Sequence, residues 1–247
     1  MGKAYLLLGR DEEAIAWTQR SLAAARPTDV VFHFSGYLQL AAAYARLGRL
    51  GEAHRGLAEV IRLQPYYTVR STWIGSLEQI ERYRAALRLA GLRDHAEEDA
   101  DFDVPADGCL RNGIRGLTPT TAPGAATIRT AEVRRLLDGR KPIVIDTQWH
   151  ATGQSIPGAY AFRDAGLGGS MSDAMQDHLQ KKMFELTKGD LATPIVAVGW
   201  NSESFDGYNL TLRFVALGFT NVYWYRGGCE AWEVAGLPKT AVDVQDW

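Results

Sequence analysis

Cysteine is scarce in this sequence: Cys109 and Cys229 are the only two among 247 residues. Two cysteines so far apart provide neither a disulfide framework nor a cluster of metal ligands. Long apolar runs are absent as well, since none approaches the ~20 residues that span a bilayer. The apolar stretch within residues 1–10 is too short for a signal peptide. We therefore expect a cytoplasmic protein with no membrane span, metal or other cofactor.

An excess of charge of one sign is also lacking. The net charge of −2 gives no electrostatic basis for binding nucleic acid or an anionic membrane. The hydrophobic fraction of 46% and the charged fraction of 23% are ordinary for a globular protein. The length suits two small domains, or one large one, with a normal buried core. The patterning predicts a helical module at residues 1–92, a linker at 93–126 and an α/β domain at 127–247.

The helical module contains an internal repeat. Residues 4–14 and 43–53 both read Ala-Tyr, then Leu-Gly-Arg, then Glu-Ala at the same offsets. This order predicts a helix, a glycine turn and a second, closely packed helix, and it resembles the tetratricopeptide (TPR) repeat. A third helix is expected at about 73–90, where it would cap the stack.

The TPR resemblance implies a protein or peptide partner bound on this module. The first copy lacks most of its first helix. Because stacked repeats need about three units to bury a continuous core, we expect the module to be part of a longer array or to be completed by its partner.

The predicted linker differs in composition from both flanking regions. An acidic run from Asp94 to Asp103 precedes scattered glycines and prolines. Such a segment buries too little apolar surface to order itself, so a solvated linker is expected. Cys109 lies in this segment, and we interpret it as an incidental thiol.

The C-terminal part alternates between strand and helix signals. Apolar runs at 143–146, 195–198 and 221–225 suit strands that are buried on both faces. Helix signals at about 130–138, 173–187 and 206–217 separate them. This alternation predicts a parallel sheet flanked by helices.

The same region resembles the rhodanese family over about 110 residues. The matching marks are Ile145-Asp146, residues 156–159 (Ile-Pro-Gly-Ala), residues 218–222 (Gly-Phe-Thr-Asn-Val), Gly227-Gly228 with Ala231-Trp232, and residues 236–238 (Gly-Leu-Pro). The resemblance implies a sulfurtransferase fold. In that family a cysteine nucleophile begins the loop that here follows Val198.

That cysteine is missing. The nucleophile position falls on Trp200, or on Gly199 if the alignment moves by one residue, and neither side chain can carry a persulfide. A rhodanese branch with paired cysteines in a longer loop is also similar, and there the two positions fall on Trp200 and Ser204. Glu203 and Asp206 add negative charge where an anionic donor would bind. The loop as a candidate site for a small anion or other ligand comprises Gly199, Trp200, Asn201, Ser202, Glu203, Ser204, Phe205, Asp206 and Gly207.

The alternative nucleophile is Cys229, at the start of the last predicted helix. A helix N-terminus lowers the pKa of a thiol, and Arg226 would assist, whereas Glu230 would oppose a thiolate. We favour the interpretation of Cys229 as a small residue packed in the tight turn after Gly227-Gly228. We interpret the chain as a non-catalytic binding or regulatory protein, with sulfur transfer through Cys229 as the alternative. The combination of modules also resembles the C-terminal region of bacterial TPR-containing adenylate/guanylate cyclase-related proteins.

Overall fold

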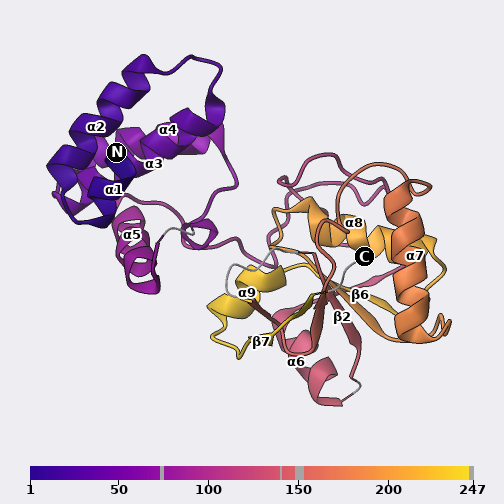
Figure 1. Cartoon of the computed structure of the whole chain (residues 1–247). Helices are drawn as coiled ribbons and strands as arrows, with labels where there is room; N and C mark the ends of the chain where they lie inside the picture. Colours follow the sequence, from indigo (N-terminus) through magenta and orange to yellow (C-terminus); the bar gives the residue numbers. More distant parts are fainter. Residues whose placement is uncertain (73–74, 140, 148–152, 245–247) are drawn as a thin grey trace. The chain divides into compact units, whose positions relative to one another are not determined.

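The computed structural model describes residues 1–72, 75–139, 141–147 and 153–244 (Figure 1). The chain divides into two compact units, Met1–His95 and Ala96–Trp247, and each is described by itself. No helix within the described ranges is long and apolar enough to cross a membrane.

The first unit is helical. A 3₁₀ turn at Val69–Ser71 precedes its last helix, which begins after a capping box formed by Ser76 and Gln79. Trp73, where the sequence placed the start of this helix, lies outside the described residues. The helices are α1 (Gly2–Leu7), α2 (Asp11–Ala24), α3 (Val30–Arg46), α4 (Leu50–Leu63) and α5 (Leu77–Leu89).

The turns between α1 and α2 and between α3 and α4 have the same structure. Gly9 and Gly48 take left-handed backbone angles, with φ of +79° and +73°. In the first turn the Arg10 N–H donates to the Tyr5 carbonyl at 2.9 Å, and in the second the Arg49 N–H donates to the Tyr44 carbonyl at 2.9 Å. The arginine guanidinium carbon lies 4.7 or 4.6 Å from the centre of that tyrosine ring. The sequence repeat therefore corresponds to a repeated helix–turn–helix structure.

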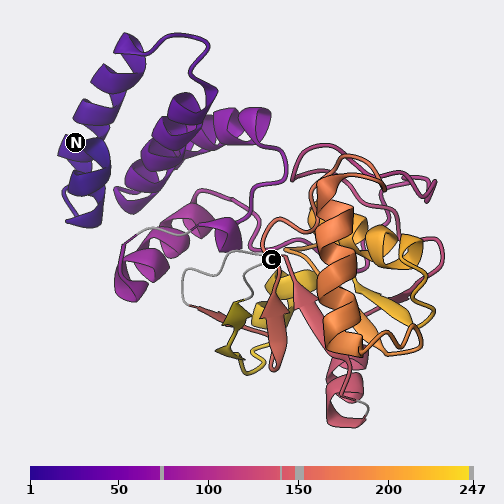
Figure 2. The same cartoon turned by 45° about the vertical axis from the view of Figure 1, so that its right-hand side comes forward.

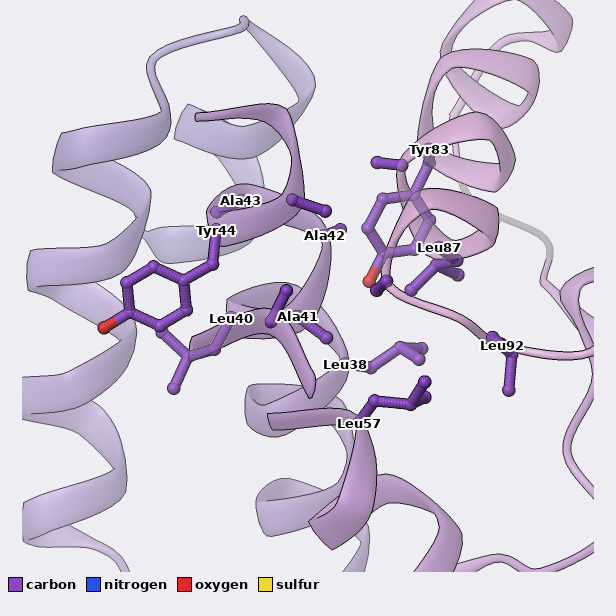
Figure 3. Packing of buried hydrophobic residues seen from close by; sticks show 14 of the residues in the cluster. Leu38, Leu40, Ala41, Ala42, Ala43, Tyr44, Leu57, Tyr83, Leu87 and Leu92 are labelled. Atoms are coloured by element: carbon purple, nitrogen blue, oxygen red, sulfur yellow. The ribbon is translucent and has the colours of Figure 1, made fainter. Parts of the chain in front are cut away.

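Helix α3 is central to the core of this unit, because it contacts α2, α4 and α5 (Figure 3). Its alanines at 41–43 are fully buried, and small side chains allow neighbouring helices to approach closely. On α4, a Cβ added to Gly56 would lie 3.2 Å from the backbone nitrogen of Ala41. Leu57 of α4 and Leu87 of α5 complete the packing around α3.

The second unit contains the predicted parallel sheet. Its six strands follow the order β1-β6-β5-β2-β4-β8, and every neighbouring pair is parallel. A separate antiparallel pair joins β3 (Gln154–Ser155) to β7 (Thr240–Ala241). The strands of the larger sheet are β1 (Ala126–Ile128), β2 (Ile143–Asp146), β4 (Ala159–Ala161), β5 (Ile195–Val198), β6 (Val222–Tyr225) and β8 (Asp243–Val244).

Helices cover both faces of this sheet (Figures 1 and 2). Helices α6 (Thr130–Gly139) and α9 (Gly228–Val234) share one apolar core with β2, β5 and β6. Helices α7 (Ala174–Thr187) and α8 (Phe205–Ala216) share the core on the opposite face. Because successive side chains of a strand point to opposite faces, the uninterrupted apolar runs predicted from the sequence serve both cores.

Residues 96–125 differ from the solvated linker that the sequence predicted. They contain neither a helix nor a strand, yet they belong to the second compact unit and run beside α8 (Figure 2). Thr118 is fully buried, and Ala122 packs against Tyr208 and Trp224. Hydrogen bonds to distant parts of the chain order this segment, and its own composition gives no sign of them.

Candidate functional site

The candidate loop lies at the carboxyl ends of the central strands, where open parallel sheets place their ligand sites. Residues 199–207 (the 199–207 loop) connect β5 to α8 and include the first residues of α8. The first residues of α9, Cys229 and Glu230, lie against this loop: the Cys229 N–H donates to the Gly199 carbonyl at 3.0 Å, and the Glu230 N–H donates to the Trp200 carbonyl at 3.0 Å. The fold therefore brings the two candidate sites of the sequence analysis together.

The 199–207 loop is buried. Phe205 is partly buried, and its N–H donates to the Ile114 carbonyl at 3.0 Å. A buried loop cannot present a reacting group to a dissolved substrate unless the protein opens. Six side chains of the loop are almost completely inaccessible to solvent. Their exposed fractions are 7% for Trp200, 3% for Asn201, 0% for Ser202, 5% for Glu203, 1% for Ser204 and 7% for Asp206.

The Asp206 carboxylate binds backbone N–H groups of its own loop. It accepts hydrogen bonds from the N–H groups of Trp200 at 3.2 Å and Gly207 at 2.9 Å, and from the Thr147 hydroxyl at 3.0 Å. Burial raises the pKa of Asp206, and hydrogen bonds from Ser204, Gly207 and Thr147 lower it only in part. An external anion would have to displace this internal one.

The close approach of the backbone at residue 199 to Asp206 explains why this residue is glycine. A Cβ added to Gly199 would lie 2.4 Å from Asp206 Oδ1 and 2.5 Å from the nitrogen of Gly207. Only glycine fits at this position without moving the loop.

Trp200 itself packs into the core. It belongs to the apolar cluster that includes Val198, Cys229 and Trp232. The Arg115 guanidinium carbon lies 5.8 Å from the centre of a Trp200 ring, within the range of a cation–π contact. The side chain at the expected nucleophile position is thus a buried packing element.

Cys229 is buried with a protonated thiol. Its Sγ–H donates to Asp146 Oδ2 at 3.2 Å, and Asp146 also accepts a hydrogen bond from the Ser155 hydroxyl. Burial, followed by the Asp146 charge, raises the pKa of the Cys229 thiol well above its ordinary value. The alternative in the sequence analysis required the helix N-terminus to lower this pKa. The structure gives the opposite direction, because the sulfur is buried and the Asp146 carboxylate faces it.

Two charged residues near Cys229, Arg226 before α9 and Glu230 within α9, have partners other than the thiol. Arg226 is 3% exposed, and its guanidinium donates to the Thr118 hydroxyl and carbonyl at 3.1 Å and to the Glu98 carbonyl at 2.8 Å. Glu230 is fully buried and accepts from the Asn201 amide at 2.9 Å and the Ala96 N–H at 2.7 Å. Burial lowers the pKa of Arg226. Both charges anchor the segment that begins at residue 96.

A small cavity of about 180 Å³ lies beside Asp206. Thr147 follows β2 directly and Arg163 lies two residues beyond the end of β4, so both lie at the same sheet edge as the 199–207 loop. Sequence reasoning missed them, although their positions after apolar strands were a usable signal. The lining residues are Gly113, Ile114, Thr147, Arg163, Asp164, Gly166, Leu167 and Asp206.

A comparison with protein-family models identifies the family of the C-terminal part of the chain. Residues 127–235 match the model of the "Rhodanese-like domain". Residues 127–235 are a rhodanese-like domain. The resemblance stated from the sequence is confirmed for this part of the chain.

Three solved structures show weaker similarity. The thiosulfate sulfurtransferase from Pseudomonas aeruginosa has a TM-score of 0.37 and 21% identity, over 49% of this chain and 21% of that chain. A full-length protein from Lactobacillus plantarum has a TM-score of 0.36 and 21% identity, over 47% of this chain and 88% of that chain. The polysulfide-sulfur transferase homodimer from Wolinella succinogenes has a TM-score of 0.34 and 13% identity, over 50% of this chain and 81% of that chain. The alignment thus spans about a fifth of the length of the Pseudomonas protein. No curated protein matches the chain.

Within the rhodanese-like domain, the described residues form no group of three or more His, Cys, Asp or Glu side chains arranged to hold a metal. His150, a histidine close to the end of β2 in sequence, lies outside the described residues. The TPR and cyclase-related resemblances stay predictions.

Proposed function

We propose that this chain is a non-catalytic binding or regulatory protein whose rhodanese-like domain does not transfer sulfur. One observation carries the proposal: the Asp206 carboxylate accepts hydrogen bonds from N–H groups of the 199–207 loop, and Trp200, to which the sequence analysis assigns the nucleophile position, is buried. Sulfur transfer needs a thiolate that attacks the donor and an open site that admits it. Neither requirement is met by a buried loop without cysteine.

Cys229 is the group on which the alternative depends. A relocated nucleophile would need a lowered thiol pKa and access to solvent. The raised pKa and the 5% exposure of Cys229 both argue against this role. The exposed Cys109 lies on the segment before the rhodanese-like domain and provides an internal control for thiol reactivity.

The helical unit would supply the partner-binding function through TPR-like repeats. Its repeated turns support this, and so does an exposed apolar group at the start of α3, where Val30, Val31 and Phe32 are 46%, 78% and 47% exposed. Exposed apolar groups of this kind are typical of protein interaction sites. We propose a protein or peptide partner, a cytoplasmic location consistent with two free thiols, and a regulatory role that includes the cyclase-related context.

We also propose that the 199–207 loop binds a small anion when the Asp206 carboxyl is protonated. Because the Asp206 carboxylate holds the loop N–H groups of Trp200 and Gly207, an anion gains them only when this carboxyl is neutral. Binding of thiosulfate, measured by calorimetry, should therefore strengthen as the pH falls toward the pKa of Asp206.

The test is a thiosulfate-to-cyanide sulfurtransferase assay on the full chain, with Cys229→Ser and Cys109→Ser beside it. We expect no activity in any of the three proteins. Activity that disappears in Cys229→Ser alone would overturn the proposal. Iodoacetamide labelling near pH 8, read by mass spectrometry, should modify Cys109 quickly and Cys229 only after unfolding.

A further inference from the structure

The cavity beside Asp206 combines apolar side chains on its solvent side with a polar floor. Ile114 and Leu167, which line it, are 58% and 39% exposed. Thr147 and Asp206 also line it and are only 5% and 7% exposed. A ligand entering from solvent would therefore pass apolar side chains before it reached a hydroxyl and a carboxylate. A few polar groups within apolar walls are typical of sites for small organic molecules, and the volume of about 180 Å³ suits a short one.

The charges in the described lining of the cavity favour a cation. Arg163 and Asp164 carry opposite charges, and both side chains are exposed, so water weakens their interaction with a ligand. The third charged residue is the buried Asp206. Coulomb interactions are about fourfold stronger at the effective dielectric constant of a partly buried site than in water. The carboxylate at the floor therefore determines the charge that a ligand meets.

The rest of the protein does not fully compensate the charge of Asp206. Arg115 lies near enough to lower the pKa of this carboxyl, and the hydrogen bonds that it accepts act in the same direction. Burial nevertheless raises the pKa on balance, so the folded chain disfavours the carboxylate. A cation in the cavity would stabilise this charged form.

The Thr147 hydroxyl is placed so that it can free an acceptor position on Asp206. Its oxygen lies 3.0 Å from Asp206 Oδ2 and 3.3 Å from the Val198 carbonyl oxygen, with hydrogen-bond geometry to both. A hydroxyl has one proton and two lone pairs, so it donates fully to only one of these acceptors. When the proton turns to Val198, Asp206 Oδ2 and the Thr147 oxygen can both accept from an incoming ammonium group.

We propose that this cavity binds a primary alkylammonium group, with the nitrogen at Asp206 and Thr147 and the apolar stem between Ile114 and Leu167. A small free amine and the side chain of a lysine share this chemistry. The inference goes beyond the proposed function, because the anion proposed for the 199–207 loop requires the neutral carboxyl of Asp206 and the amine requires the carboxylate.

Three ligands of similar size separate charge from shape: n-butylammonium, n-butanol and butyrate. Each is titrated into the full wild-type chain at pH 8 and followed by ligand-observed NMR. Butylammonium should bind at least about tenfold more tightly than butanol, because only the cation is attracted by the carboxylate, and butyrate should bind more weakly than either. Equal affinity for butylammonium and butanol, tighter binding of butyrate, or no binding of butylammonium would overturn the proposal.

Variants locate the ammonium group within the cavity. Asp206→Asn should weaken butylammonium at least about tenfold, whereas Asp164→Asn, the matched control on the solvent side, should weaken it less than about threefold. Thr147→Val removes the hydroxyl acceptor and should weaken binding, whereas Thr147→Ser keeps it. Circular dichroism shows whether each variant is folded, and the ligand series on wild type decides the question if Asp206→Asn is not. Equal losses in the two aspartate variants would reject the site.

Acetyl-lysine amide identifies the source of the ammonium group, because it carries the same stem on a peptide backbone. Affinity equal to that of butylammonium would assign the site to a lysine side chain, and affinity at least about tenfold lower would assign it to a free amine. None of these readouts depends on sulfurtransferase activity, so failure of amine binding is distinct from failure of the proposed function.

Discussion

Asp206 is the residue that sets the charge of the 199–207 loop. Its carboxylate is buried, and its pKa is raised because desolvation outweighs the hydrogen bonds it accepts. A folded-state pKa raised above the unfolded value of ~3.9 gives stability that is present at low pH and lost as the pH rises through the folded pKa.

Asp206→Asn should remove this pH dependence. The difference in unfolding free energy between the variant and the wild type should shift in favour of the variant as the pH rises from about 4 through the raised pKa. Urea denaturation at a series of pH values measures it. A difference that stays constant with pH would contradict the assignment of a raised pKa.

Gly228 is the residue that permits the α9 turn to meet the 199–207 loop. Its φ is +60°, and an added Cβ would lie 2.4 Å from the Gly199 carbonyl oxygen and 2.5 Å from that of Trp200. These neighbours are backbone atoms, which cannot move aside as a flexible side chain would.

Gly228→Ala should therefore lower the free energy of unfolding by more than the cost of placing alanine in a left-handed backbone conformation, because its Cβ would also clash with backbone atoms. Gly236→Ala is the control, since its φ is +64° and nothing lies within 4 Å of the added Cβ. The control should lose roughly 1–2 kcal/mol of unfolding free energy, and Gly228→Ala clearly more. Equal losses in urea denaturation would show that the close approach has no cost.

At the scale of elements, one ion pair joins the start of α7 to α8. Asp173 caps α7 by accepting from the Gln176 N–H at 2.9 Å, and its two carboxylate oxygens accept from Arg213 at 3.0 and 2.9 Å. Arg213 is fully buried in α8. Hydrogen bonding to Arg213 holds the pKa of Asp173 well below its usual range.

Asp173→Asn keeps a capping oxygen and removes the charge. We expect a loss of about 2 kcal/mol of unfolding free energy at pH 7, because a buried guanidinium loses its charged partner. A lowered pKa gives stability above ~3.9 that is lost as the pH falls, so the variant should lack this acid-side loss.

Asp173→Ala separates the cap from the charge. It should lose about 1 kcal/mol more than Asp173→Asn, the usual contribution of an N-cap side chain. Thermal unfolding at pH 7 and pH 3 measures both terms, and a pH-independent effect of Asp173→Asn would refute the ion-pair explanation.

At the scale of the whole molecule, the second unit begins at Ala96 rather than at the start of the family match at residue 127. Residues 96–118 hydrogen-bond Ser202, Arg226 and Glu230. The rhodanese-like domain therefore packs against a segment that the family match does not include.

A fragment of residues 96–247 should unfold in one cooperative transition, whereas residues 127–247 should be markedly less stable. Each hydrogen bond lost with the segment contributes roughly 1 kcal/mol. Circular dichroism melts of the two fragments measure the difference. Equal melting temperatures would show that the segment is dispensable.

Local sequence predicted the elements of this protein well. The strands at 143–146 and 195–198 begin and end where their apolar runs do. The repeated tyrosine followed by Leu-Gly-Arg correctly predicted both turns between helices. These features depend on side chains that are neighbours in the chain, so a single sequence contains them. The lack of cysteine in residues 199–207 can likewise be read from the sequence, and the assignment of Trp200 to the nucleophile position stays a prediction.

Tertiary structure alone decided the state of the candidate site. The Ser202 hydroxyl bonds the Glu97 carbonyl across 105 positions of sequence, and Cys229 meets Asp146 across 83. Such contacts bury the 199–207 loop, raise the thiol pKa and turn an expected linker into a packed segment. By itself the sequence determined the fold of residues 127–235 and the absence of any cysteine from the 199–207 loop. Only the folded chain determined access and charge at the loop, because burial and hydrogen bonding depend on residues that are far apart in the sequence.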